Sequence, residues 1–154
     1  MVYFKDCKEL TYLGLGHTSV GDAGLMHFKD CKALTGLYLY GVNLNDAGLA
    51  HFKECKALTH LILPETKVSD AGLALFKGVP LRQLLIQNTG ITDLTPLQGM
   101  PLEEIRLTPK NITKGLDLLH DMKSLKTIGI SWESDKVWPA AEFWERYDKG
   151  EFNE

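Results

Sequence analysis

The sequence predicts an α/β solenoid in which short strands and helices alternate in stacked repeats, and two observations carry this prediction. Three segments align almost residue by residue, namely FKDCKELTYLGLGHTSVGDAGL, FKDCKALTGLYLYGVNLNDAGL and FKECKALTHLILPETKVSDAGL. The first leucine of each copy also returns at near-constant steps, at Leu10, Leu34, Leu58, Leu81, Leu102 and Leu125. Self-similarity with a period of roughly 20 to 50 residues is typical of solenoids. We therefore expect six repeats.

Each repeat contains one strand signal and one helix signal. The pattern L-x-x-L-x-L alternates apolar and polar residues, which predicts a short strand that is buried on one side. The motif D-A-G-L follows at 22–25, 46–49 and 70–73, and its aspartates Asp22, Asp46 and Asp70 are expected to cap helices. A helix between successive strands makes the strands parallel. Helices also need more lateral room than strands, so we expect strands on a concave face and helices on a convex face.

The repeat resembles the bacterial leucine-rich-repeat family, in its cysteine-containing form with the 24-residue unit D-A-G-L-x-x-F-K-x-C-K-x-L-T-x-L-x-L. The resemblance covers about residues 3–130 and implies a right-handed horseshoe arc with about six parallel strands. Residues 91–102 lack D-A-G-L and are similar to the shorter internalin-type repeat, in which a tight turn replaces the helix. Pro96 and Pro101 agree with this, because proline interrupts a helix. The family is known mostly for protein binding.

The two ends of the repeat array differ. Residues 1–130 are predicted to form the array and residues 131–154 a carboxyl-terminal cap. Ala140, Phe143, Trp144 and Tyr147 share one helical face, so a capping helix is expected near 139–149. Nothing precedes the first repeat to cover its edge. This predicts self-association through that edge, or a chain that is part of a larger multidomain bacterial protein, for example a receptor-like kinase.

Composition and charge argue against some classes of partner and location for this protein. The chain has 154 residues and 17 basic against 20 acidic side chains, for a net charge of -3. With this net charge the protein has no overall positive potential to attract the phosphate backbone of a nucleic acid, so nucleic acid is not an expected partner. No segment has the apolar length of a membrane span or a signal peptide, which predicts a cytoplasmic protein. Three cysteines favour free thiols in a reducing compartment.

No motif predicts a metal, a cofactor or catalysis. Cys7, Cys31 and Cys55 recur at the repeat interval, and stacked copies point the same way instead of converging on one ion. A buried column of thiols is the prediction. His27 and His51 occupy equivalent positions of two repeats, and Leu75 occupies the same position of the next repeat. This position therefore requires a large side chain and not an imidazole. No nucleophile, base and orienting group share a motif, and we expect no enzyme.

The functional prediction concerns the variable residues between the strand leucines. Framework positions are nearly fixed, whereas these outward positions differ between copies, as expected for a scaffold that displays individual chemistry. The predicted exposed anchors of this surface are Tyr38, Tyr40, Ile62 and Leu85. Beside them, open space is predicted where side chains are missing, at Gly14, Gly16, Gly36 and Gly129. The full predicted partner-binding set is Tyr12, Tyr38, Tyr40, His60, Ile62, Gln83, Leu85, Gln87, Glu104 and Arg106.

The sequence therefore predicts a non-enzymatic protein–protein interaction module that presents a concave surface to a protein or peptide. The alternative is a structural repeat segment of a larger protein without a partner of its own.

Overall fold

A computed structural model describes residues 7–152 and shows an α/β arrangement around one sheet. The strands are β1 (Tyr12–Gly14), β2 (Gly36–Tyr38), β3 (His60–Ile62), β4 (Gln83–Leu85), β5 (Glu104–Arg106), β6 (Thr127–Gly129) and β7 (Val137–Pro139). The helices are α1 (Asp22–Leu25), α2 (Asp46–Leu49), α3 (Asp70–Ala74), α4 (Leu116–His120) and α5 (Ala140–Asp148). Short 3₁₀ turns are η2 (Met26–Phe28), η3 (Ala50–Phe52), η4 (Thr95–Leu97), η5 (Pro109–Asn111) and η6 (Ser134–Lys136).

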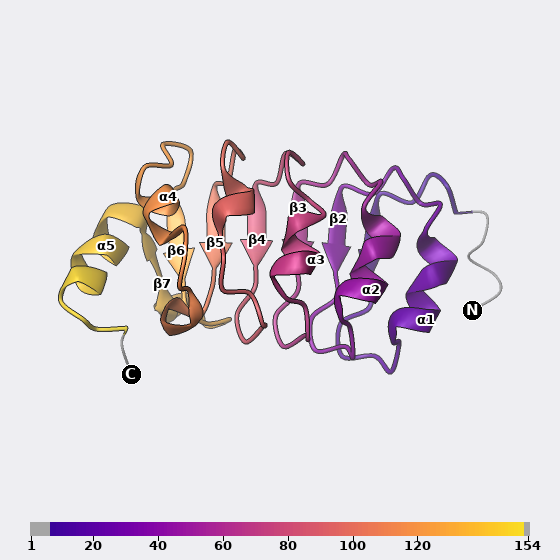
Figure 1. The fold of residues 1–154 in the computed structure, drawn as a ribbon, viewed down its shortest axis with the longest axis horizontal. Helices are drawn as coiled ribbons and strands as arrows, with labels where there is room; N and C mark the ends of the chain where they lie inside the picture. The colour runs from indigo at the N-terminus through magenta and orange to yellow at the C-terminus, as the bar shows by residue number, and fades with distance from the viewer. Residues whose placement is uncertain (1–6, 153–154) are drawn as a thin grey trace.

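The sheet follows the order of the chain, from β1 to β7, and the repeats succeed one another along it (Figure 1). Strands β1 to β6 pair in parallel, with Leu37 opposite Leu61 and Leu61 opposite Leu84. This confirms the predicted parallel strands and their register. The sequence analysis missed β7, which pairs antiparallel with β6 because a short turn, and not a helix, connects the two.

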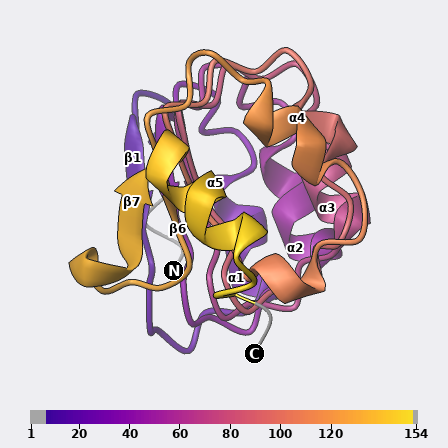
Figure 2. The ribbon, with the colours of Figure 1, turned by 90° about the vertical axis from the view of Figure 1, so that its left-hand side faces the viewer.

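Helices α1 to α4 lie on one side of the sheet, and α5 lies across the end formed by β6 and β7 (Figure 2). The space between the layers is filled by the framework residues. Leu25, Leu37, Phe52 and Leu61 are each less than 2% exposed. Apolar burial of this kind is the main force that stabilises the stack.

The short repeat has the form predicted for it. Where α1 to α3 have the motif D-A-G-L, residues 95–97 form only the 3₁₀ turn η4, with proline near its start. Leu94 and Leu97 still point inward and are fully buried. One turn is therefore enough to close the core at this repeat.

The aspartates of D-A-G-L do not cap their own helices, contrary to the prediction. The caps are Asn45 for α2 and Ser69 for α3, whose side chains accept from the amides of Ala47 and Ala71. Asp46 instead accepts from the amide of Ser69 in the next repeat, at 2.8 Å. Asp22 and Asp70 accept in the same way, from the amides of Asn45 and Thr92. We call these contacts aspartate staples, because each joins one repeat to its successor.

The glycine of the motif leaves room for the staple. A Cβ at Gly48 would collide with the carboxylate of Asp22, and a Cβ at Gly72 with that of Asp46. The aspartate and the glycine of D-A-G-L thus act together in the contact between neighbouring repeats. The aspartate of one repeat fits against the glycine of the next.

The cysteines lie as predicted, in a buried column. Cys31 and Cys55 are buried, Cys7 is half-buried, and Cys55 Sγ donates to the carbonyl oxygen of Cys31 at 3.4 Å. Burial, with a smaller contribution from Cys31, raises the pKa of Cys55 to about 11. The thiol is therefore neutral at physiological pH.

Candidate functional site

The candidate site is the face of the sheet that points away from α1 to α4, which we call the strand face. Its residues come from the first and last positions of each strand and from the position two residues after it. The structure brings the ten predicted residues onto this face, in the parallel register of β1 to β5. It does not leave all of them accessible.

Aromatic rings gather at the amino-terminal part of the strand face. Tyr12 is 55% exposed, and its ring stacks on that of Tyr38 with centroids 6.3 Å apart. Tyr38 is half-buried, and this burial, together with the nearby Tyr12, raises the pKa of its hydroxyl. Gly36 makes this pair possible, because a Cβ there would collide with both rings. The tyrosines are therefore fixed in place and still face solvent.

A second aromatic group forms two residues further along the strands. The ring of Tyr40 meets His17 edge-on at 5.0 Å and Trp132 edge-on at 5.2 Å. It also fills the space over Gly16, where a Cβ would collide with it. Trp132 was not among the predicted residues. It follows the last parallel strand, in a stretch that the sequence analysis assigned to the cap.

Three predicted contact residues are buried, and for them the prediction of exposure is wrong. Ile62 is 3% exposed, Leu85 is 4% exposed and Gln87 is 2% exposed. Their strands lie where the sequence placed them, but their side chains are covered on this face. The open space predicted at the glycines is filled by neighbouring side chains at Gly16, Gly36 and Gly129. Only Gly14 keeps it, since a Cβ added there would meet no atom within 4 Å.

A polar chain crosses β4, β5 and the segment after β6. Gln83 Nε2 donates to Glu104 Oε2 at 2.8 Å, and Glu104 Oε1 pairs with Arg106 Nε at 2.7 Å. Arg106 Nη1 then donates to the carbonyl oxygens of Ser131 and Trp132, at 3.1 and 2.9 Å. Glu104 and Arg106 were predicted to share a face as partner-binding residues. They do share it, but they are mostly buried and hold another part of the chain.

His60 is half-buried and takes part in a ladder of threonines. Its Nδ1 lies 2.8 Å from Thr59 Oγ1, and this hydroxyl donates to the carbonyl oxygen of Thr35 at 3.1 Å. Thr35 donates in the same way to Thr11. Because the hydroxyl proton is already engaged, the contact positions the imidazole and does not create a nucleophile.

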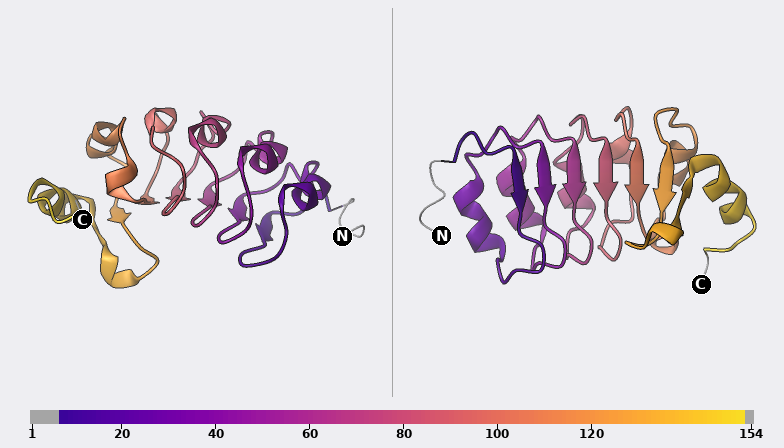
Figure 3. Two further views of the ribbon diagram at one scale, coloured as in Figure 1. Left: turned by 60° about the horizontal axis from the view of Figure 1, so that its bottom comes forward. Right: turned by 180° about the vertical axis from the view of Figure 1, so that it is seen from behind.

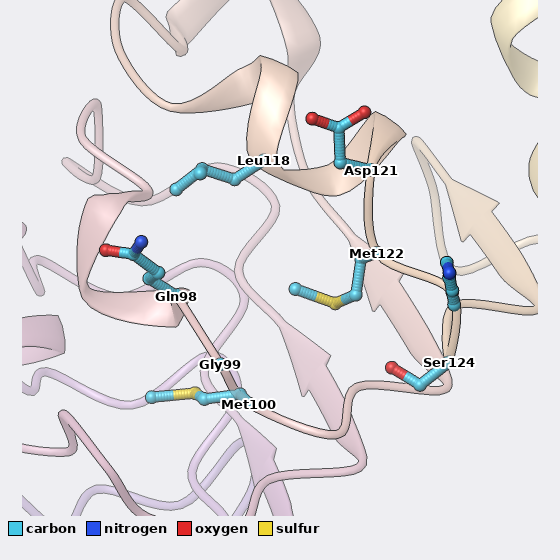
Figure 4. Close-up of a pocket in the computed structure, with 8 residues that line it drawn as sticks. Gln98, Gly99, Met100, Leu118, Asp121, Met122 and Ser124 are labelled. Atoms are coloured by element: carbon cyan, nitrogen blue, oxygen red, sulfur yellow. The ribbon is translucent and has the colours of Figure 1, made fainter.

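The helix side has a shallow pocket of about 340 Å³ between η4 and α4 (Figure 4). Met100, Leu118 and Met122 contribute apolar side chains to its lining, and Asp121 contributes a carboxylate (Figure 4). Among the described residues that line it there is no histidine or cysteine. Over residues 7–152 no cluster of three or more His, Cys, Asp or Glu side chains could hold a metal ion. No helix in that range is long and apolar enough to cross a membrane.

Comparisons with known proteins find likenesses among solved structures but not among sequences. No family model and no curated protein sequence matches the chain. Among solved structures, internalin C2 from Listeria monocytogenes strain 4b F2365 is similar over 80% of this chain and 82% of that chain. The identity is 14% and the TM-score 0.36. A likeness of this size transfers no function, so the function is inferred from the strand face itself.

Proposed function

We propose that this chain is a non-enzymatic interaction module of leucine-rich-repeat architecture, which binds a protein or peptide through its strand face. In this proposal residues 1–130 are the repeat array, residues 131–154 are its cap, and the arc is a right-handed horseshoe with the strand face on its concave side. The module acts in the cytoplasm and uses neither metal nor cofactor.

The exposed aromatic residues carry the proposal. Over the described residues the exposed large hydrophobic side chains are Tyr12 (55%), Met26 (48%) and Trp132 (44%). Two of the three belong to the aromatic groups of the strand face. Tyrosine and tryptophan are enriched among residues that dominate binding energies, since they supply much contact area and lose little conformational entropy.

The rigid strands that carry Tyr12 and Tyr38 also favour a role of these residues in partner binding. Tyr12 and Tyr38 project from paired strands, so their rings need little ordering when a partner binds. Gly14, also exposed, leaves open space beside them into which a partner side chain can enter. We therefore place the accessible contact surface at Tyr12, Gly14, Tyr38 and Tyr40.

Quantitative capture of partners from a lysate of the native host tests the proposal. The double variant Tyr12→Ala/Tyr38→Ala should capture about tenfold less partner than the wild type, because it removes two aromatic anchors. Met26→Ala is the matched control, since Met26 has similar exposure on the helix side. Equal capture by the double variant and the wild type would refute the assignment of the strand face. So would an equal loss with Met26→Ala.

A further inference from the structure

The segment between β6 and β7 lies on the strand side of the sheet, and we call residues 131–136 the strap. Figure 3 shows this part of the chain projecting on the strand side of the molecule, away from the helices. Arg106 on β5 holds the carbonyl oxygens of Ser131 and Trp132. The Trp132 ring reaches Tyr40, which follows β2. The side chains of Trp132 and Tyr40 therefore meet across the strands that lie between them.

The buried part of the strand face lies between the same two anchors. Ile62 belongs to β3, Leu85 to β4, and Gln87 follows β4. All three point away from the helix layer and are nevertheless 2 to 4% exposed. Residues on the same face outside this interval, such as Tyr12 and Gly14, remain open.

The strap fits its place imperfectly. Trp132 keeps 44% of its surface exposed, although it lies against Tyr40. Beneath this part of the face, neither Oε1 nor Nε2 of Gln87 has a hydrogen-bond partner. A buried amide without partners is unfavourable, since it has lost its water and gained nothing in return. Beyond Trp132 the strap residues 133–136 are exposed.

We propose that the strand face between Tyr40 and Arg106 is a docking surface for an extended segment of a partner protein that carries a large aromatic side chain, and that Trp132 of the strap occupies this surface until the partner displaces it. The strap shows what the surface accepts. Its aromatic ring lies against Tyr40, and its backbone carbonyls accept from Arg106. A partner segment that also offers a polar group to Gln87 would satisfy an amide that the strap leaves unpaired. This inference rests on the proposed function.

The test uses the full chain and a synthetic peptide of residues 130–137, I-S-W-E-S-D-K-V, labelled for fluorescence anisotropy. Trp132→Ala empties the aromatic position of the strap, and the peptide should bind this variant about tenfold or more tightly than the wild type, in which the tethered strap competes. The same peptide with alanine for tryptophan should not bind. Tyr40→Ala in the Trp132→Ala background should abolish binding of the unmodified peptide.

Three controls make each outcome decisive. Met26→Ala should bind the peptide as weakly as the wild type. Circular dichroism verifies that Trp132→Ala is folded, and a variant with the strap replaced by glycine and serine repeats the measurement in an independent background. Lack of peptide binding by both folded variants overturns the proposal, as does equal binding by wild type and Trp132→Ala. A wild-type dimer in sedimentation that Trp132→Ala dissolves also overturns it, because the occupant would then be the strap of a second copy.

Capture from host lysate separates this inference from the proposed function. If both hold, Trp132→Ala captures more partner than the wild type does. If the wild type captures a partner through Tyr12 and Tyr38 but the peptide never binds, only the docking inference fails. If the peptide binds Trp132→Ala and Tyr12→Ala/Tyr38→Ala leaves capture unchanged, only the proposed surface fails.

Discussion

The strand face is open around β1 and β2 and closed around β3 and β4, although the same leucine framework supports both regions. Tyr12 on β1 is 55% exposed, whereas Leu85, at the far end of β4, is 4% exposed. The repeats beneath them have the same register. In the docking proposal the difference comes from the strap, whose Trp132 ring meets Tyr40 and whose backbone carbonyl accepts from Arg106. In that proposal a repeat sequence builds a uniform scaffold, and one distant segment decides which part of it is accessible.

The largest effect should come from truncating a side chain in the closed region. Leu85→Ala should lower the free energy of unfolding by about 2–5 kcal/mol, as for other fully buried leucines. Tyr12→Ala in the open region should lower it by about 1 kcal/mol or less. Urea denaturation followed by circular dichroism measures both. Similar losses for the two variants would mean that the regions do not differ in burial.

The aspartate staples allow a comparison of the regular repeats with the later ones. Gly48→Ala should destabilise the chain by about 1–3 kcal/mol, because the new methyl group displaces Asp22 from the Asn45 amide. In an Asp22→Ala background the same change should cost much less, which a double-mutant cycle detects. Additive effects would contradict the staple. Helix α4 of a later repeat has Leu118 at the position where α1 to α3 have the glycine of D-A-G-L. Leu118→Ala should therefore show no coupling to Asp22.

Acid should weaken the junction between the regular and the later repeats. Burial alone would raise the pKa of Asp70, but hydrogen bonds from the amides of Thr92 and Asp93 outweigh it, and the pKa is lowered. Hydrogen bonds from Thr95 and Lys114 lower the pKa of Asp93 to about 2. Both groups have an ordinary value of 3.8 when unfolded, so their stabilising contribution is complete above that pH.

This contribution is lost as pH falls from about 4 through about 2, where the folded carboxylates take up protons. The melting temperature should therefore fall over this range. Asp70→Asn, whose amide cannot take up that proton, should make the fall shallower. An unchanged pH profile for Asp70→Asn would show that Asp70 does not join the two regions.

The smallest effect is expected at the surface of the later repeats. Glu103 joins Arg82 of the fourth repeat to Lys126 of the sixth, and hydrogen bonds from Lys126 and Arg82 lower its pKa. Arg82 and Lys126 are mostly exposed, so water and salt screen both ion pairs. Glu103→Gln should shift the melting temperature slightly at low ionic strength and not at all at high salt. A large shift that persists in salt would contradict this.

The repeat pattern predicted the parallel strands, the short repeat at 91–102 and the buried cysteine column. The recurring leucines and the helix signals between them predicted the strands, the missing D-A-G-L with Pro96 and Pro101 predicted the short repeat, and the recurring cysteines predicted the column. These features depend on contacts between equivalent positions of neighbouring repeats, and the period of the sequence encodes them directly. The same period placed the ten candidate residues on one face. It could not predict the exposure of each, because alternation gives the direction of a side chain and not what covers it.

Only the tertiary structure decided which candidates are accessible. Trp132 and Tyr40 are 92 positions apart, and no repeat relates them, so nothing in the pattern indicates that they meet. The role of the D-A-G-L aspartates was also decided there, since a carboxylate beside a helix start can bind its own helix or the next repeat, and only the packed geometry selects between them. Periodic sequence determines the scaffold through contacts between neighbouring repeats, whereas a contact between distant, unrepeated residues such as Trp132 and Tyr40 is decided only in the tertiary structure.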